Sequence, residues 1–164
     1  MTQTISYIKT EQKFNSLQEE CYILATTLDK DYIRDFLNQA FKEDKIVLFF
    51  GDNAKDHAKT YQANGIIIDQ TMSLEKITDL TPIRKSLGKD AIIGLITRNR
   101  RHETMLSAEL EPDFIIFKAW QDGLNKTTEL LSWYNDFFLI QSAVFAQEDI
   151  DTTNIPADFI IKTL

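Results

Sequence analysis

Short apolar runs and amphipathic stretches alternate along most of this chain. Three of the runs are near copies of one another: NGIIID at 64–69, PDFIIF at 112–117 and ADFIIK at 157–162. A second set consists of KIVLFF at 45–50, AIIGLI at 91–96 and FFLIQSAVF at 137–145. Runs of this length, rich in β-branched residues and without polar alternation, are typical of strands buried on both faces. Together with CYILAT at 21–26, they predict about seven strands.

The stretches between the runs have helical periodicity, which predicts helices over 31–43, 73–88, 101–111 and 123–136. The first of these places its apolar residues on one stripe. In the second, Ser73 is the expected N-cap and Gly88 the expected C-cap, while Pro82 is expected to kink or split the helix.

Strands that alternate with helices predict a parallel sheet with its helices outside. An open doubly wound sheet and a (β/α) barrel both fit, but no Gly-x-Gly-x-x-Gly follows the first strand, so the dinucleotide-binding open sheet lacks local support. Members of each set recur roughly every 45–50 residues, which is typical of two βα units and favours the barrel. Because complete barrels have eight strands in about 250 residues, we expect a reduced or incomplete TIM-type barrel over 21–164. An N-terminal extension would occupy 1–20, and about one βα unit and the last helix would be missing.

Composition and charge narrow the range of partners. The 164 residues carry a net charge of −7, which argues against nucleic-acid binding but permits a small anionic ligand in a local cationic pocket. Cys21 is the single cysteine, which excludes an intramolecular disulfide and a cysteine-based metal cluster. No apolar run approaches the ~18 residues of a membrane span, and the first 20 residues lack an apolar signal. A cytoplasmic protein without a membrane partner is therefore expected.

Three segments also match a known family in order and spacing. They are HAKTYQANGIIIDQ at 57–70, LGKDAIIGLITRNRRHETMLSAELEPDFIIFKAW at 87–120 and LLSWYNDFFLIQSAVFAQEDIDTTNIPADFIIKTL at 130–164. They resemble segments of the thiamine-phosphate synthases, which are (β/α) barrels, and the match is collinear from about residue 45 onward. The resemblance implies a transferase of thiamine biosynthesis, which joins a pyrimidine pyrophosphate to a thiazole phosphate with the help of Mg²⁺.

The family's metal-binding pattern is only partly present. Its first magnesium aspartate falls on Asp52, for which the ordinary alternative is an N-cap of the next helix. Its second falls on Met72, whose thioether cannot replace a carboxylate on Mg²⁺, although Asp69 or Asp79 is expected nearby. Gln70 matches a family glutamine and is a candidate ligand-binding residue.

The phosphate-binding pattern is eroded further. The family's substrate loop becomes KAWQDGLNKTT, which begins at Lys118 and lacks the threonine-lysine motif. The Gly-Gly phosphate cradle falls on Ser142 and Ala143, where side chains stand in place of bare backbone. The last phosphate loop falls on Lys162 and Thr163. The resemblance thus makes Lys118, Lys162 and Thr163 candidate phosphate ligands.

The most basic stretch of the chain is TRNRRH at 97–102. Arg98, Arg100 and Arg101 would form an anion pocket at the barrel mouth if they face the strand ends, because arginine suits phosphate oxygens. The alternative is an exposed helix start, with the arginines in water or in surface ion pairs.

The sequence therefore predicts a thiamine-phosphate synthase-like protein with lost or reduced catalysis, which would need Mg²⁺ only if active and otherwise no cofactor. The alternative is a pseudoenzyme that binds a phosphorylated small molecule or a protein partner. An unclosed barrel would expose strand edges, so a homodimer is expected. A small α/β domain of the response-regulator shape is a further alternative, although Asp29 and Asp31 form no convincing acidic pair there.

Overall fold

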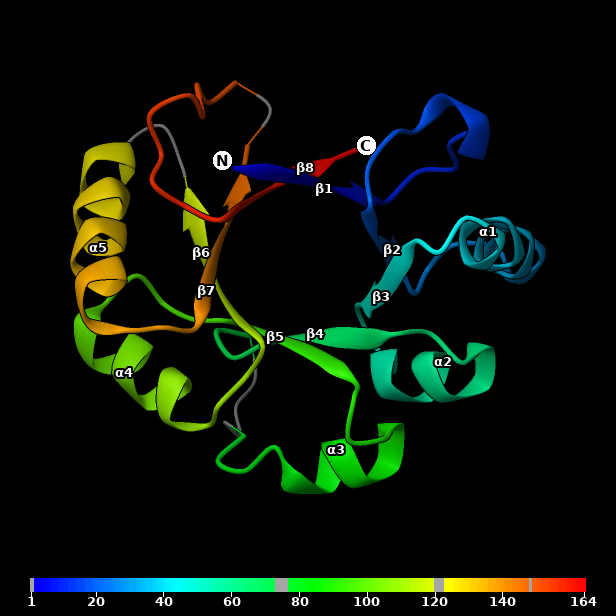
Figure 1. Ribbon diagram of the computed structural model, residues 1–164, viewed down its shortest axis with the longest axis horizontal. Coiled ribbons are helices and arrows are strands. Elements are labelled where there is room, and N and C mark those ends of the chain that lie inside the picture. The colour runs from blue at the N-terminus through cyan, green and yellow to red at the C-terminus, as the bar shows by residue number, and fades with distance from the viewer. Residues whose placement is uncertain (1, 73–76, 120–122, 148) are drawn as a thin grey trace.

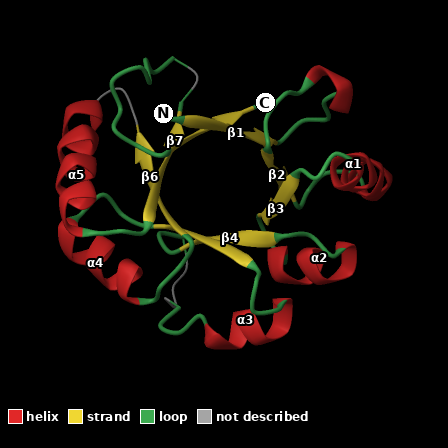
Figure 2. Ribbon diagram, viewed as in Figure 1, coloured by secondary structure: helices red, strands yellow, loops and turns green. Residues whose placement is uncertain are grey.

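The computed structural model describes residues 2–72, 77–119, 123–147 and 149–164. In this part of the chain, eight parallel strands follow one another around a closed barrel, and the last pairs with the first (Figures 1 and 2). The strands are β1 (Gln3–Ile8), β2 (Cys21–Ala25), β3 (Ile46–Phe50), β4 (Gly65–Asp69), β5 (Ile92–Ile96), β6 (Phe114–Ala119), β7 (Gln141–Ala146) and β8 (Phe159–Thr163). The predicted (β/α) TIM-type barrel is confirmed.

The predicted strand count is wrong, because the barrel is complete rather than reduced. The additional strand, β1, comes from residues 1–20, which the sequence analysis placed in an extension. Its sequence QTISYI mixes polar and apolar residues and contains no continuous apolar run. The polar Ser6 is buried on the outer side, where its hydroxyl donates to Glu19 at 2.7 Å. A closed barrel has no free strand edges, so the reason for expecting a homodimer no longer applies.

The helices are α1 (Lys30–Lys42), α2 (Ala54–Tyr61), α3 (Thr81–Leu87), α4 (Arg101–Glu109) and α5 (Leu124–Phe137). Three agree with their predicted positions. The helix predicted over 73–88 is shorter: α3 begins at Thr81, and Pro82 lies in its first turn, where a missing N–H costs nothing. The proposed N-cap Ser73 lies outside the described residues. The N-cap of α2 is Asn53, in the left-handed conformation with φ 59°, rather than Asp52.

The helices do not surround the barrel evenly. Within the described residues, an α-helix follows each of β2 to β6, whereas loops cover the side formed by β7, β8 and β1 (Figure 1). Ile150 and Ile155 of the β7–β8 loop are buried in one apolar cluster with Ile160 of β8. Phe14, which begins a short 3-10 turn (Phe14–Ser16), packs on Phe36 of α1 with ring centroids 5.2 Å apart. Loop side chains thus replace helices, which is how a chain of 164 residues closes the barrel.

The barrel interior is filled by inward-facing side chains from every strand, centred on isoleucine, leucine and phenylalanine. Near the amino ends of the strands, Phe114 and Phe159 contact each other with ring centroids 6.3 Å apart. Gly94 makes room for them, because a Cβ there would lie 2.5 Å from the Phe114 ring. The amino end of the barrel is therefore packed with apolar groups. In the described part of the chain, no helix has the length and apolarity to span a bilayer.

Candidate functional site

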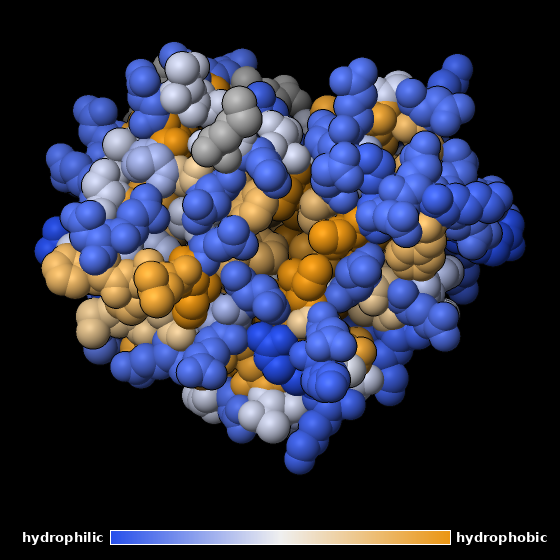
Figure 3. Space-filling model, in the orientation of Figure 1, coloured by the Kyte–Doolittle hydropathy of each residue, from blue (hydrophilic) through white to orange (hydrophobic). Residues whose placement is uncertain are grey.

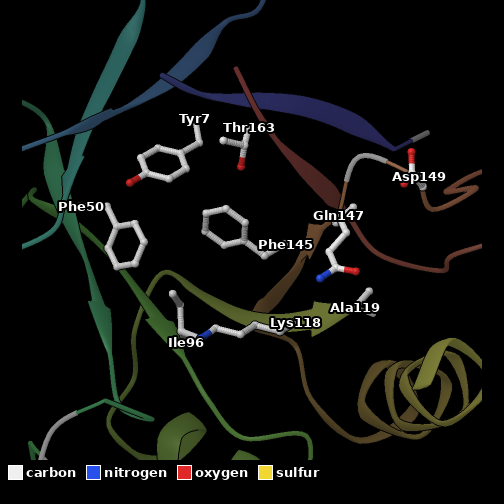
Figure 4. Close-up of a pocket in the computed structure, with 10 residues that line it drawn as sticks. Tyr7, Phe50, Ile96, Lys118, Ala119, Phe145, Gln147, Asp149 and Thr163 are labelled. Carbon is white, nitrogen blue, oxygen red and sulfur yellow. The ribbon is translucent and has the colours of Figure 1, made fainter. Parts of the chain in front are cut away.

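A cavity of about 590 Å³ opens where the carboxyl ends of the strands meet (Figure 4). We call this opening the mouth, and it is the position of the active site in TIM-barrel enzymes. The cavity is lined by Tyr7, Phe50, Ile96, Lys118, Ala119, Phe145, Ala146, Gln147, Asp149 and Thr163. Most of these residues come from strands far apart in the sequence, which closure of the barrel brings together, and Gln147 and Asp149 come from the loop after β7.

Three aromatic rings form the apolar wall of this mouth cavity. The ring centroid of Tyr7 lies 5.5 Å from that of Phe50 and 5.6 Å from that of Phe145, and the two phenylalanine rings lie 6.0 Å apart. Burial raises the pKa of the Tyr7 hydroxyl above its ordinary value. The hydroxyl therefore stays protonated at neutral pH and can donate a hydrogen bond to a ligand.

Lys118 and Asp69 form an ion pair at the mouth. Alternation along β6 and β4 turns both side chains inward, since Ile116 and Ile67, two residues earlier, belong to the interior cluster. The Lys118 ammonium lies 3.3 Å from Oδ2 of Asp69, and the side chains are 30% and 12% exposed, respectively. In Figure 4, Lys118 extends beside Ile96 of the intervening strand β5.

The second oxygen of Asp69 is also occupied. Its Oδ1 accepts hydrogen bonds from the backbone N–H of Thr71 at 2.9 Å and from the hydroxyl of the same residue at 2.5 Å. The carboxylate is therefore fixed in orientation by its own loop and presents Oδ2 to Lys118. Among the inward positions of the described strands, only those of Asp69 and Lys118 carry charged side chains.

A second cavity of about 780 Å³ adjoins the first and shares two of its lining residues, Phe50 and Lys118. Its other walls include Asp52 from the loop after β3, Asp69 from the carboxyl end of β4, and Met72. Lys118 thus borders both cavities. The face of the molecule in Figure 3 shows a hollow with apolar residues at its centre and polar residues around it.

The predicted ligand residue Gln70 has a different role. Its side-chain amide donates to the backbone oxygen of Ile77 at 2.9 Å and accepts from the backbone N–H of Ile77 at 3.1 Å. Gln70 is buried and does not line either mouth cavity. It ties Ile77, on the approach to α3, to the end of β4.

The three predicted arginines lie at the start of α4, on the surface. Arg98 and Arg100 each place a guanidinium nitrogen 3.9 Å from the carboxylate of Glu103, and the Arg101 guanidinium lies 5.1 Å from the ring centre of Trp133. None of the three lines either mouth cavity. The geometry favours the exposed helix start over the anion pocket.

The remaining predicted residues separate into two groups. Thr163 faces the mouth cavity, and Asp52 is exposed at the wall of the second cavity. Lys162 points outward from β8 and is exposed, paired in register with the outward Ser6. It cannot contact a ligand in the mouth.

Ser142 and Ala143, on which the Gly-Gly phosphate cradle of the family falls, do not lie at the mouth. Both residues lie in the amino half of β7, where the backbone N–H of Ser142 donates to Asp158 at 2.9 Å. The apolar run at 137–145 includes the end of α5 and a loop, so β7 begins later than the run does. Ala146 and Gln147 occupy the carboxyl end instead.

Sequence reasoning missed Tyr7, Phe50, Phe145 and Gln147, and it did not pair Asp69 with Lys118. A signal for the pair was present. Asp69 ends the run IIID and Lys118 follows the run FIIF, so each is the last inward residue of a buried strand. Tyr7 carried no such signal, because its strand was not recognised.

The Mg²⁺ implied by the resemblance can be tested against the donors present. In the part of the chain that the structure describes, no group of three or more His, Cys, Asp and Glu side chains is placed to hold a metal ion. Asp52 and Asp69 line one cavity, and Mg²⁺ commonly takes one or two carboxylates when substrate phosphates supply further oxygens. Asp52 and Asp69 would therefore supply two carboxylates at most, and an ion here would need further oxygens from a diphosphate and would compete with Lys118 for Asp69.

Comparison with known proteins finds similar structures but no similar sequences. No protein-family model and no curated protein matches the chain. KGPDC from Streptococcus mutans superposes with a TM-score of 0.60 at 11% identity, over 99% of this chain and 87% of that one. A second structure of the same protein, in complex with a phosphorylated ligand, gives the same TM-score and identity, over 97% and 87%.

Type I 3-dehydroquinate dehydratase from Clostridium difficile, with covalent modified comenic acid, gives a TM-score of 0.63 at 7% identity, over 99% of this chain and 84% of that one. At these identities the likeness shows the fold alone. None of the three is a thiamine-phosphate synthase, and that resemblance stays a prediction. The chain has the TIM-barrel fold that these enzymes share.

Proposed function

We propose that the protein binds a phosphorylated small molecule in the mouth cavity, with Lys118 as the cation that anchors it. The observation that carries this proposal is the position of Lys118: a partly exposed ammonium at the last inward position of β6, bordering both cavities. A barrel of similar fold has been solved with a phosphorylated ligand, which supports a ligand of this class here.

The surroundings of Lys118 suit a small polar molecule with an organic body. An ammonium has three donors, and the contact with Asp69 uses one of them. The hydroxyl groups of Tyr7 and Thr163 line the same cavity and add two further donors. The wall of aromatic rings provides the apolar surface against which the carbon skeleton of a ligand packs.

Within this proposal, the protein is a thiamine-phosphate synthase-like barrel with lost or reduced catalysis. The collinear resemblance and the shared barrel architecture support it. The second candidate is an active, Mg²⁺-dependent transferase, which one observation favours: Asp52 and Asp69 line a single cavity beside Lys118. In that case the two carboxylates would hold Mg²⁺ on a diphosphate, and Lys118 would balance its negative charge.

Thermal unfolding with added ligands tests both candidates. The ligands are inorganic phosphate, pyrophosphate, thiazole phosphate, thiamine phosphate and ribose 5-phosphate, each with and without Mg²⁺. A ligand at 100 times its Kd stabilises the folded state by about 2.7 kcal/mol, which raises the Tm by several degrees.

The two lysines of strands β6 and β8 supply matched variants. Lys118→Met should abolish the ligand-induced shift in Tm, whereas Lys162→Met, on the outer face, should retain it. A shift that requires Mg²⁺ and disappears in Asp52→Asn would favour the transferase. Absence of any shift, or an equal shift in Lys118→Met, would overturn the proposed function.

A further inference from the structure

We propose that the ε-amino group of Lys118 forms an imine with small aldehydes or ketones that enter the mouth cavity. The inference deepens the proposed function, on which it rests for the access of a ligand to Lys118. It adds that the ligand presents a carbonyl group and that its binding is covalent and reversible.

The first support is the isolation of the amine. Lys118 faces the interior from the last inward position of β6, and Asp69 is the other charged residue at the inward positions of the described strands. Its side chain is 30% exposed, so the amine is reachable from the mouth cavity while most of its stem is covered. Lysine amines held in partly desolvated pockets are the ones that proteins use to form Schiff bases.

The second support is the base beside the amine. A nucleophile needs a proton acceptor within reach, and Oδ2 of Asp69 lies 3.3 Å from the Lys118 nitrogen. The two hydrogen bonds from Thr71 hold the other oxygen of this carboxylate. Asp69 is therefore oriented to exchange protons with the amine.

Imine formation needs no reagent beyond the carbonyl compound and the two side chains. The Lys118 ammonium passes a proton to the Asp69 carboxylate, and the free amine attacks the carbonyl carbon. A C–N bond forms while the π electrons move to the carbonyl oxygen, and transfer of a proton from nitrogen to oxygen gives the carbinolamine. Asp69 then returns its proton to the hydroxyl group, which leaves as water as the C=N bond forms. The product is a protonated imine beside the restored carboxylate, so the charge of the ion pair is conserved.

The third support is the apolar wall of the cavity. The rings of Tyr7, Phe50 and Phe145 occupy the space in which water would otherwise collect below the ligand. Exclusion of water protects an imine from hydrolysis. The cavity of about 590 Å³ lies within the range of ordinary small-molecule sites.

Three related compounds allow imine formation and phosphate binding to be tested independently. Dihydroxyacetone phosphate carries a ketone and a phosphate, dihydroxyacetone the ketone alone, and glycerol 3-phosphate the phosphate alone. Each is incubated with the intact protein, sodium borohydride is added to reduce any imine to a stable secondary amine, and the modified residue is located by peptide mass spectrometry. Thermal shifts are measured in parallel without borohydride.

We expect a single adduct on Lys118 with both ketones, none with glycerol 3-phosphate, and no adduct on the exposed Lys162 of the same molecule. Lys118→Met should lose the adduct. Asp69→Asn should slow formation of the adduct about 100-fold, the usual contribution of a positioned general base. Lys162→Met should form the adduct at the same rate as the unaltered protein.

The inference is overturned if borohydride leaves Lys118 unmodified, or if lysines including Lys162 are modified equally. Because the unaltered protein contains both lysines, this comparison holds even where a variant fails to fold. If dihydroxyacetone phosphate and glycerol 3-phosphate both raise the Tm through Lys118 but no adduct forms, the proposed function survives and the imine does not. If the ketones are trapped and glycerol 3-phosphate gives no shift, the imine stands and the phosphate ligand is wrong.

Discussion

Removal of the Lys118 ammonium should destabilise the protein more than removal of both charges of its ion pair. Lys118→Met keeps the length of the side chain but leaves the Asp69 carboxylate, only 12% exposed, without its cation. Asp69→Asn in the same molecule removes the orphaned charge. The double variant is therefore expected to be more stable than Lys118→Met alone, which is the opposite of additive behaviour.

The magnitude follows from the distance and the burial. Two unit charges 3.3 Å apart attract by about 5 kcal/mol at an effective dielectric constant of 20. Desolvation of both groups and screening by water in the mouth cancel much of this attraction. Breaking a buried ion pair costs about 3–5 kcal/mol, whereas an exposed pair contributes about 0.2–1 kcal/mol. Between these limits, we expect Lys118→Met to cost about 2–3 kcal/mol, with a coupling energy of about 1–2 kcal/mol.

Urea unfolding of all four proteins, followed by far-UV circular dichroism at pH 7, measures the cycle. The coupling should persist in high salt, because a largely buried pair is screened much less than a surface pair. If the two single changes add within about 0.5 kcal/mol, the pair contributes nothing and the geometry assigned to Lys118 is wrong.

Three further predictions concern other parts of the barrel. Gly94→Ala should cost about 1–3 kcal/mol in urea unfolding, because the new Cβ would meet the Phe114 ring at 2.5 Å. Gln70→Ala should cost about 1–2 kcal/mol and speed hydrogen exchange at the Ile77 amide, since both of its hydrogen bonds are lost. Burial raises the pKa of the Cys21 thiol to about 12, so at pH 8 its reactive thiolate is scarce in the folded protein. A disulfide reagent should therefore react at least 100-fold faster, to order of magnitude, once the protein is unfolded in urea.

Each of these has an outcome that would contradict it. Gly123→Ala is the control for Gly94→Ala, because a Cβ at Gly123 meets no atom within 4 Å, and equal costs at both sites would rule out crowding. Unchanged exchange at Ile77 in Gln70→Ala would mean that the glutamine does not hold that segment. Equal reaction rates of Cys21 in folded and unfolded protein would show an accessible thiol.

Most of the barrel could be predicted from the sequence because its strands are buried on both faces and therefore read as continuous apolar runs. The strand β1 could not. Its outward side carries both the apolar Ile8 and the polar Ser6, whose hydroxyl donates to Glu19 from the next loop. The sequence QTISYI therefore contains no continuous apolar run, and a single sequence does not show that the side chain of Ser6 finds a partner in the next loop.

The candidate site was predicted less well, because its residues depend on strand register. The arginines at 98–101 were selected by charge, yet they follow β5 after the chain has turned outward into α4. Lys162 and Thr163 are neighbours in sequence, and alternation sends one outward and the other into the mouth. A shift of a single residue exchanges these positions, which is why family resemblance at low similarity placed some candidates at the mouth and others on the outer face.

The side of the barrel that lacks helices also forms part of the mouth cavity. The loop after β7 covers the barrel wall with Ile150 and Ile155, and the same loop lines the mouth cavity with Gln147 and Asp149. A loop that both closes the core and borders the cavity cannot change its packing without altering the space above the aromatic rings. On the opposite side of Lys118, helices follow β3 and β4; Asp52 lies in the loop after β3, and Asp69 ends β4. The ion pair at the mouth thus lies on helix-supported strands, whereas the loop-covered side contributes Gln147 and Asp149 to the cavity wall.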